Sequence, residues 1–124
     1  MKLSEAIRLG SMLGPQGFGC YSLGDFRCAI ASATFAATGR SLASLSEVAE
    51  LWPIVLTRPA GWHWPNPQHL EGGRHMNQSP TVFTAILCLN DHERWTREQI
   101  ADWVEGIERQ HGAAAAEVVA EVSA

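Results

Sequence analysis

The cysteines and histidines are the residues of this chain whose types and spacing could support chemistry. Cys88 and His92 are four residues apart, the spacing that places two side chains on one face of a helix. Cysteine sulfur and histidine nitrogen are preferred zinc ligands, and further histidines precede this pair. One hypothesis is therefore a small zinc-binding module with ligands from His69, His75, Cys88 and His92. Because only the Cys88–His92 pair has a defined geometry, our main expectation is that the chain binds no cofactor.

Cys28 supports a second hypothesis, a cysteine-dependent hydrolase. It falls in the first turn of an expected helix, where backbone N–H groups and the helix dipole can stabilise a thiolate. Such a nucleophile needs a histidine, and His92 is the candidate because Asn90 and Asp91 could orient it. A free cysteine among alanines is ordinarily a small buried hydrophobic residue. We therefore expect no catalytic residue in this chain.

The sequence Trp62-His63-Trp64-Pro65 is the best candidate for a surface that contacts another protein. Tryptophan is enriched at binding hot spots, and neighbouring prolines lower the entropy cost of ordering a loop. The alternative is that these rings cover the core of a small domain. We predict that Trp62, His63 and Trp64 form a protein-binding surface.

Composition and charge limit the classes of protein to which the chain can belong. Its 124 residues fit one domain, and 46% hydrophobic with 18% charged residues is ordinary globular usage. A formal net charge of -4 with scattered arginines argues against nucleic-acid binding. Three cysteines without a Cys-x-x-Cys pair favour a reducing cytoplasm over a disulfide framework. We find no export signal and no membrane-spanning stretch, and homo-oligomerisation stays open.

The clearest structural signal is a capping box at Thr96 and Gln99, which predicts a helix beginning at about Arg97. Apolar residues recur behind it at i, i+3, i+4 and i+7, the spacing of one buried helical face. The opposite face carries Glu98 and Asp102, whose charge would repel DNA phosphates. This helix is therefore unsuited to be the recognition element of a helix-turn-helix.

The first half of the chain predicts three helices. Ser4 is the expected N-cap of the first, which runs to about Leu13, and a glycine-rich loop fills 14–24. Ser22 and Asp25 mark the start of the second helix, whose stripe includes Phe26 and which Gly39 ends. A second capping box, Ser44 and Glu47, opens a short helix over 45–51.

The second half predicts a long irregular loop followed by a helix hairpin. Residues of about 52–80 are rich in Trp, Pro and Gly and show no helical or strand period. A buried helix of about ten residues follows Pro80 and pairs with the helix from Arg97, with Trp95 at the corner. Residues 113–122 have high helix propensity, although Gly112 could separate them from that helix.

We therefore predict an all-α fold, one domain over 1–124 with five or six short helices and C-terminal helices over about 81–122. The predicted core consists of apolar residues from the helical stripes. These are Ile7, Phe26, Ile30, Phe83, Ile86, Leu87, Ile100, Trp103, Val104 and Ile107.

Three segments resemble a family of small proteins encoded by bacteriophages and prophages: MKLSEAIRLGSMLGPQGFGCYS, CAIASA and LNDHERWTREQIADWVEGIE. The resemblance covers both ends of the chain and not its middle. The family pattern includes a central Cys-Pro-x-Cys pair and histidines near the LND segment, which implies a small zinc site. This chain has WPNPQHLEGG where the cysteine pair would stand and Cys88 directly before LND, so that site is lost or rebuilt here.

The resemblance implies no activity, but it implies a phage-related setting inside a bacterial host cell. Proteins of this size in that setting often act by binding another protein. The sequence hypothesis is thus a non-enzymatic phage or prophage accessory protein that inhibits a host system or serves in an assembly. The zinc module and the Cys28 hydrolase are its alternatives.

Overall fold

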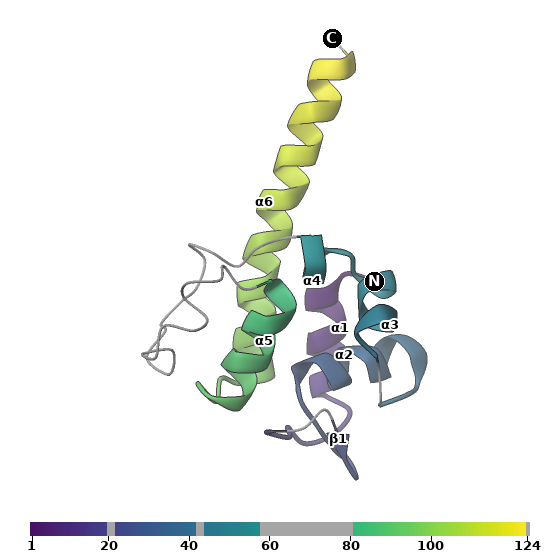
Figure 1. Cartoon of the computed structure of the whole chain (residues 1–124), viewed down its shortest axis with the longest axis vertical. Helices are drawn as coiled ribbons and strands as arrows, with labels where there is room; N and C mark the ends of the chain where they lie inside the picture. The colour runs from purple at the N-terminus through teal and green to yellow at the C-terminus, as the bar shows by residue number, and fades with distance from the viewer. Residues whose placement is uncertain (20–21, 42–43, 58–80, 124) are drawn as a thin grey trace.

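The structure, a computed structural model, describes residues 1–19, 22–41, 44–57 and 81–123. Helices dominate this part of the chain, so the all-α prediction is confirmed (Figure 1). The elements are α1 (Leu3–Ser11), β1 (Ser22–Leu23), β2 (Phe26–Arg27), α2 (Ala29–Thr38), α3 (Leu45–Leu51), α4 (Ile54–Thr57), α5 (Val82–Asp91) and α6 (Arg97–Ser123). Within the same residues, no helix combines the length and apolar character needed to span a membrane.

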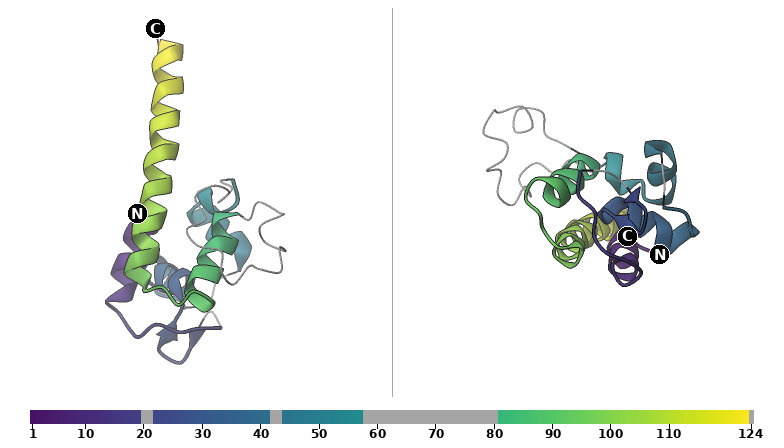
Figure 2. Two further views of the ribbon diagram at one scale, coloured as in Figure 1. Left: turned by 90° about the vertical axis from the view of Figure 1, so that its left-hand side faces the viewer. Right: turned by 90° about the horizontal axis from the view of Figure 1, so that it is seen from below.

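The centre of the fold is the packing of α1 against α2 and against the first half of α6. These two helix pairs make the most extensive contacts among the described elements. Gly10 lets α1 and α2 approach closely, because a Cβ atom added there would lie 2.1 Å from the carbonyl oxygen of Ser32. Helix α5 then runs antiparallel to the start of α6, which completes the predicted C-terminal helix hairpin (Figures 1 and 2).

Most of the predicted core is confirmed. Seven of its members are fully or almost fully buried: Ile7, Ile30, Phe83, Ile86, Ile100, Val104 and Ile107. Leu87 and Trp103 are partly buried and pack against this cluster. Phe26 was placed in the core wrongly, since it is 52% exposed.

The error at Phe26 arises from a β-hairpin where the sequence analysis expected the start of a helix. Ser22 pairs with Arg27 and Leu23 pairs with Phe26, and the turn between them contains Gly24 at φ 62°. Glycine adopts this left-handed conformation without the steric cost of a side chain. Helix α2 therefore begins only at Ala29, and Gly39 ends it as predicted, at φ 78°.

The start of α1 also differs from the prediction. Lys2 occupies the N-cap position without a side-chain hydrogen bond, and Ser4 lies inside the helix. The backbone N–H and the hydroxyl of Ser4 both donate to the carboxylate of Glu108 on α6. A residue distant in sequence thus satisfies an N–H group that a local cap would otherwise bind.

The capping box predicted at Thr96 and Gln99 forms in full, whereas at Ser44 the hydroxyl caps α3 while the Glu47 carboxylate pairs with Arg40. The hydroxyl of Ser44 accepts the Glu47 N–H at 3.2 Å, and the hydroxyl of Thr96 accepts the Gln99 N–H at 3.1 Å. The Gln99 side chain also accepts the N–H of Thr96 at 2.9 Å. Helices α3 and α6 therefore begin where the sequence predicted.

The first residues of the predicted irregular segment include a buried tryptophan and a short helix. Residue Trp52 is 5% exposed, its indole N–H donates to the carbonyl oxygen of Met1 at 3.0 Å, and α4 follows it directly. The buried indole joins the start of the chain to the core. The remainder of the predicted loop, 58–80, lies outside the described residues.

Helix α6 is a single helix of 27 residues, longer than the short helices that the sequence predicted. It continues through Gly106 and Gly112, so the predicted helix over 113–122 forms its last part. Its C-terminal half projects away from the rest of the described chain (Figure 1).

Candidate functional site

The Cys88–His92 pair does not have the features of a zinc site. Cys88 is 5% exposed on α5, whereas His92 is exposed at the C-cap of that helix. Burial, followed by the charges of Asp91 and Glu93, raises the pKa of the Cys88 thiol, which favours the neutral form over a metal-binding thiolate. Among the described residues, no three His, Cys, Asp or Glu side chains are grouped to hold a metal ion.

Two of the three histidines of the zinc hypothesis, His69 and His75, lie outside the described residues. The predicted contact residues Trp62, His63 and Trp64 lie outside them as well. Their roles therefore stay predictions.

Cys28 has the position of a structural residue. It is the N-cap of α2, where its sulfur accepts the Ala31 N–H at 3.4 Å, and it is 1% exposed. A nucleophile must meet its substrate, and this sulfur is covered by protein on all sides. Asn90 reaches the start of α2, because its side-chain oxygen accepts the Ala29 N–H at 3.1 Å.

Asn90 is the centre of a buried hydrogen-bond network. Its side chain is fully buried, and its Oδ1 atom accepts the Gln16 amide at 2.9 Å in addition to the N–H of Ala29. Its Nδ2 atom donates to the carbonyl oxygen of Gly17 at 2.8 Å and to the carboxylate of Asp91 at 2.8 Å. This one side chain therefore holds the loop after α1 against the ends of α2 and α5.

Two further contacts fix the same loop. The Gln16 amide also donates to the carbonyl oxygen of Trp95 at 2.8 Å, and the Gly19 N–H donates to Asp91 at 2.9 Å. The Gly17 N–H donates to the carbonyl oxygen of Arg27 in β2 at 2.9 Å. The loop and the β-hairpin thus form one unit that hydrogen bonds attach to the helices.

This unit carries an exposed apolar surface, which we call the hairpin-end surface. Its members are the exposed residues Met12, Leu13, Phe18, Leu23 and Phe26. Leu23 and Phe26 are cross-strand partners, whose side chains share one face of the hairpin. The hairpin and the end of α1 lie at the same end of the molecule (Figure 1).

Close contacts show that the loop touches the hairpin. A Cβ atom on Gly17, next to Phe18, would lie 3.3 Å from the Phe26 Cβ. A Cβ atom on Gly14, next to Leu13, would lie 2.9 Å from the carbonyl oxygen of Asp25. The backbone of the loop therefore lies directly against the hairpin.

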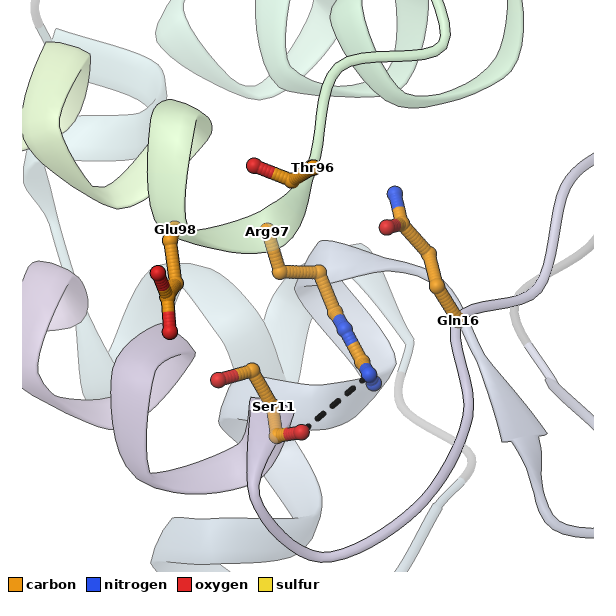
Figure 3. A pocket seen from close by; sticks show the side chains of 5 residues that line it. All are labelled: Ser11, Gln16, Thr96, Arg97 and Glu98. Atoms are coloured by element: carbon orange, nitrogen blue, oxygen red, sulfur yellow. Dashed lines mark hydrogen bonds between the residues drawn. The ribbon is translucent and has the colours of Figure 1, made fainter.

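A second feature, the Arg97 pocket, is an open depression of about 240 Å³ between the end of α1 and the start of α6 (Figure 3). It is lined by Ser11, Gln16, Thr96, Arg97 and Glu98. Burial and then the nearby charge of Arg27 lower the pKa of Arg97. Arg97 is only 8% exposed, so it does not belong to the solvent face of α6.

Sequence reasoning missed both features, although the hairpin had a signal. Gly24-Asp25 between the apolar residues Leu23 and Phe26 is a two-residue turn of the type that joins antiparallel strands. The burial of Arg97 had no comparable signal, since its acceptors come from segments distant in sequence.

Comparisons of the chain with known protein families, with curated proteins and with solved structures each give no match.

Proposed function

We propose that the protein is non-enzymatic and acts by binding another protein through the hairpin-end surface. The observation that carries this proposal is the gathering of five large apolar side chains, all exposed, at one end of the domain. Contiguous apolar patches on the surface of a folded protein often mark the sites at which it binds another protein. Their exposure costs free energy in the unbound protein, and a partner that covers them recovers it.

The support beneath this surface favours binding. The Asn90 network holds the loop and the hairpin in one arrangement before any partner arrives. A surface that is already ordered loses less conformational entropy on association, which increases affinity.

The candidate catalytic groups favour a binding role over an enzymatic one. The Cys28 sulfur is buried, and the raised pKa of Cys88 disfavours its reactive thiolate. These observations support the binding role and weaken the Cys28 hydrolase hypothesis.

The resemblance to phage and prophage proteins supports a setting inside a bacterial host cell. In that setting, we propose that the protein is an accessory factor that inhibits a host system or serves in a phage assembly. Trp62, His63 and Trp64 would then extend the contact surface beyond the hairpin end. Zinc binding through His69, His75, Cys88 and His92 is the alternative. A measurement of the metal bound to the purified protein distinguishes it from this proposal.

Substitution of Leu23 by serine tests the proposal. Leu23 is 72% exposed, so Leu23→Ser should change the free energy of unfolding by no more than about 0.5 kcal/mol. Burial of a leucine against a partner contributes about 1.5–3 kcal/mol, so partner affinity should fall by roughly tenfold or more. Affinity is measured by biolayer interferometry against proteins that the wild-type chain captures from host lysate.

Leu45→Ser is the matched control, because Leu45 is exposed on α3 and is not part of the hairpin-end surface. The proposal predicts that this control binds the captured protein as the wild type does. Equal affinities of the wild type, Leu23→Ser and Leu45→Ser would contradict the role of the hairpin-end surface.

A further inference from the structure

Two buried arginines, Arg27 and Arg97, lie close together, and neither has a carboxylate partner among the described residues. They are 7% and 8% exposed, and they meet at Gly14. Arg97 Nη2 donates to the carbonyl oxygen of Gly14 at 2.6 Å, and Arg27 Nη1 lies 2.9 Å from the position of a Cβ atom on that glycine. Arg8, Arg40 and Arg109 form ion pairs with carboxylates, and within the described residues Arg27 and Arg97 are placed in none.

Arg97 retains hydrogen-bonding capacity beyond its contacts within the chain. Its Nη1 atom donates to the Ser32 hydroxyl at 2.9 Å, and its Nη2 atom donates to the carbonyl oxygens of Ser11 at 3.2 Å and of Gly14. A guanidinium has five N–H groups, of which these contacts use three. All three acceptors are neutral, so the positive charge of Arg97 is not balanced by them.

Arg27 retains more hydrogen-bonding capacity than Arg97. Its Nε atom donates to the Ser41 hydroxyl at 2.6 Å, and its guanidinium carbon lies 3.8 Å from the centre of the Phe35 ring. Among the described residues, no acceptor is placed on either Nη group of Arg27. Two adjacent positive charges with neutral partners create a positive potential that favours an anion.

The Arg97 pocket gives an anion access to this potential. Arg97 is part of its lining, and the Glu98 carboxylate lies on the side away from the Arg97 guanidinium (Figure 3). The first backbone N–H groups of α6, at the same pocket, add the partial positive charge of a helix start. Burial and then Arg27 lower the pKa of Arg97, Cys28 raises it by a smaller effect, and a bound anion would act in the same direction as Cys28.

We propose that the Arg97 pocket binds a small oxyanion, a phosphate or a carboxylate, with Arg97 as its anchor and Arg27 as a supporting positive charge. Guanidinium groups bind both anions through paired N–H···O hydrogen bonds. This site is separate from the hairpin-end surface, and it does not depend on the function proposed for that surface.

A titration of the ¹⁵N-labelled full chain with inorganic phosphate tests the proposal, with sodium chloride at matched ionic strength as the reference. We expect saturable shifts of the amide signals at the end of α1 and the start of α6, and no saturable shifts with chloride. A parallel titration with acetate distinguishes a carboxylate site from a phosphate site. Equal, unsaturated shifts with phosphate, acetate and chloride would overturn the proposal.

Three variants assign the binding to the pocket. Arg97→Gln removes the anchoring charge. Ser11→Leu fills the pocket and keeps every arginine. Each variant should weaken phosphate binding at least tenfold. Arg109→Gln is the matched control, because Arg109 is exposed on the same helix and away from the pocket, and it should bind as the wild type does. If Arg97→Gln does not fold, Ser11→Leu decides the question, and wild-type affinity in a folded Ser11→Leu protein would overturn the proposal.

Discussion

Replacement of Asn90 by alanine should destabilise the whole domain, because this side chain connects three segments of the chain. The change removes the partners of the Ala29 N–H and of the Gly17 carbonyl group, both of which belong to buried residues. A buried polar group that loses its partner costs about 1–3 kcal/mol. Two such groups give a loss of about 2–6 kcal/mol in the free energy of unfolding, a large share of the roughly 5–15 kcal/mol of a typical domain.

The free energy of unfolding is measured by urea denaturation, followed by circular dichroism at 222 nm and extrapolated linearly to water. Gln16→Ala is the matched comparison, because it removes the two amide contacts with Asn90 and with the Trp95 carbonyl and leaves Asn90 bound to the backbone. It should cost about 1 kcal/mol, since Gln16 is only partly buried. A loss below about 1 kcal/mol for Asn90→Ala would refute the view that Asn90 fixes the loop and the hairpin.

Two further predictions concern the core. Gly10→Ala should destabilise the protein by roughly 1–3 kcal/mol, the usual cost of overpacking, because the new Cβ atom would lie 2.1 Å from the Ser32 carbonyl oxygen. Thermal unfolding measures this loss of stability. An unchanged melting temperature would contradict the close contact between α1 and α2. Because burial raises the pKa of the Cys88 thiol, the unfolded chain releases this proton at lower pH than the folded one. The contribution of Cys88 to stability should therefore be complete below the ordinary thiol pKa of about 8.5 and decline as the pH rises above it. Urea denaturation between pH 7 and 10 should show a smaller decline in Cys88→Ala than in the wild type, and equal declines would contradict this reasoning.

Local sequence signals predicted the elements whose ends are determined by neighbouring residues. Thr96 with Gln99 and Ser44 with Glu47 satisfy N–H groups within their own helices, so their spacing is sufficient to locate the start of α6 and α3. Gly39 ends α2 because glycine tolerates a positive φ, which is also a local property. The all-α class followed from these signals and from the helical spacing of the apolar residues.

Contacts between distant segments could not be predicted in this way. Ser4 has the residue type of an N-cap, but Glu108 from α6 binds it and α1 begins one residue earlier, at Leu3. Arg97 is the first residue of a helix with an exposed acidic face, yet its guanidinium is directed into the fold by acceptors on Ser11, Gly14 and Ser32. Both outcomes depend on how α1 and α6 pack, which no local pattern encodes.

The candidate surface could have been predicted in part. The Leu23-Gly24-Asp25-Phe26 sequence carries a hairpin signal, but the surrounding glycines also fit an irregular loop. The role of Asn90 inside the domain depends on where the loop after α1 lies. The location of the hairpin-end surface is thus a tertiary property.

The most direct test of the proposed function is site-specific photo-crosslinking in a bacterial host cell, with benzoyl-phenylalanine placed at Leu23, at Phe26 or at Leu45. The first two positions lie on the hairpin-end surface, and the third is an exposed control on α3. We predict one discrete crosslinked partner from Leu23 and from Phe26 and none from Leu45. Crosslinks from Leu45 alone, or none from Leu23 and Phe26 in a folded protein, would contradict the hairpin-end surface as the binding site.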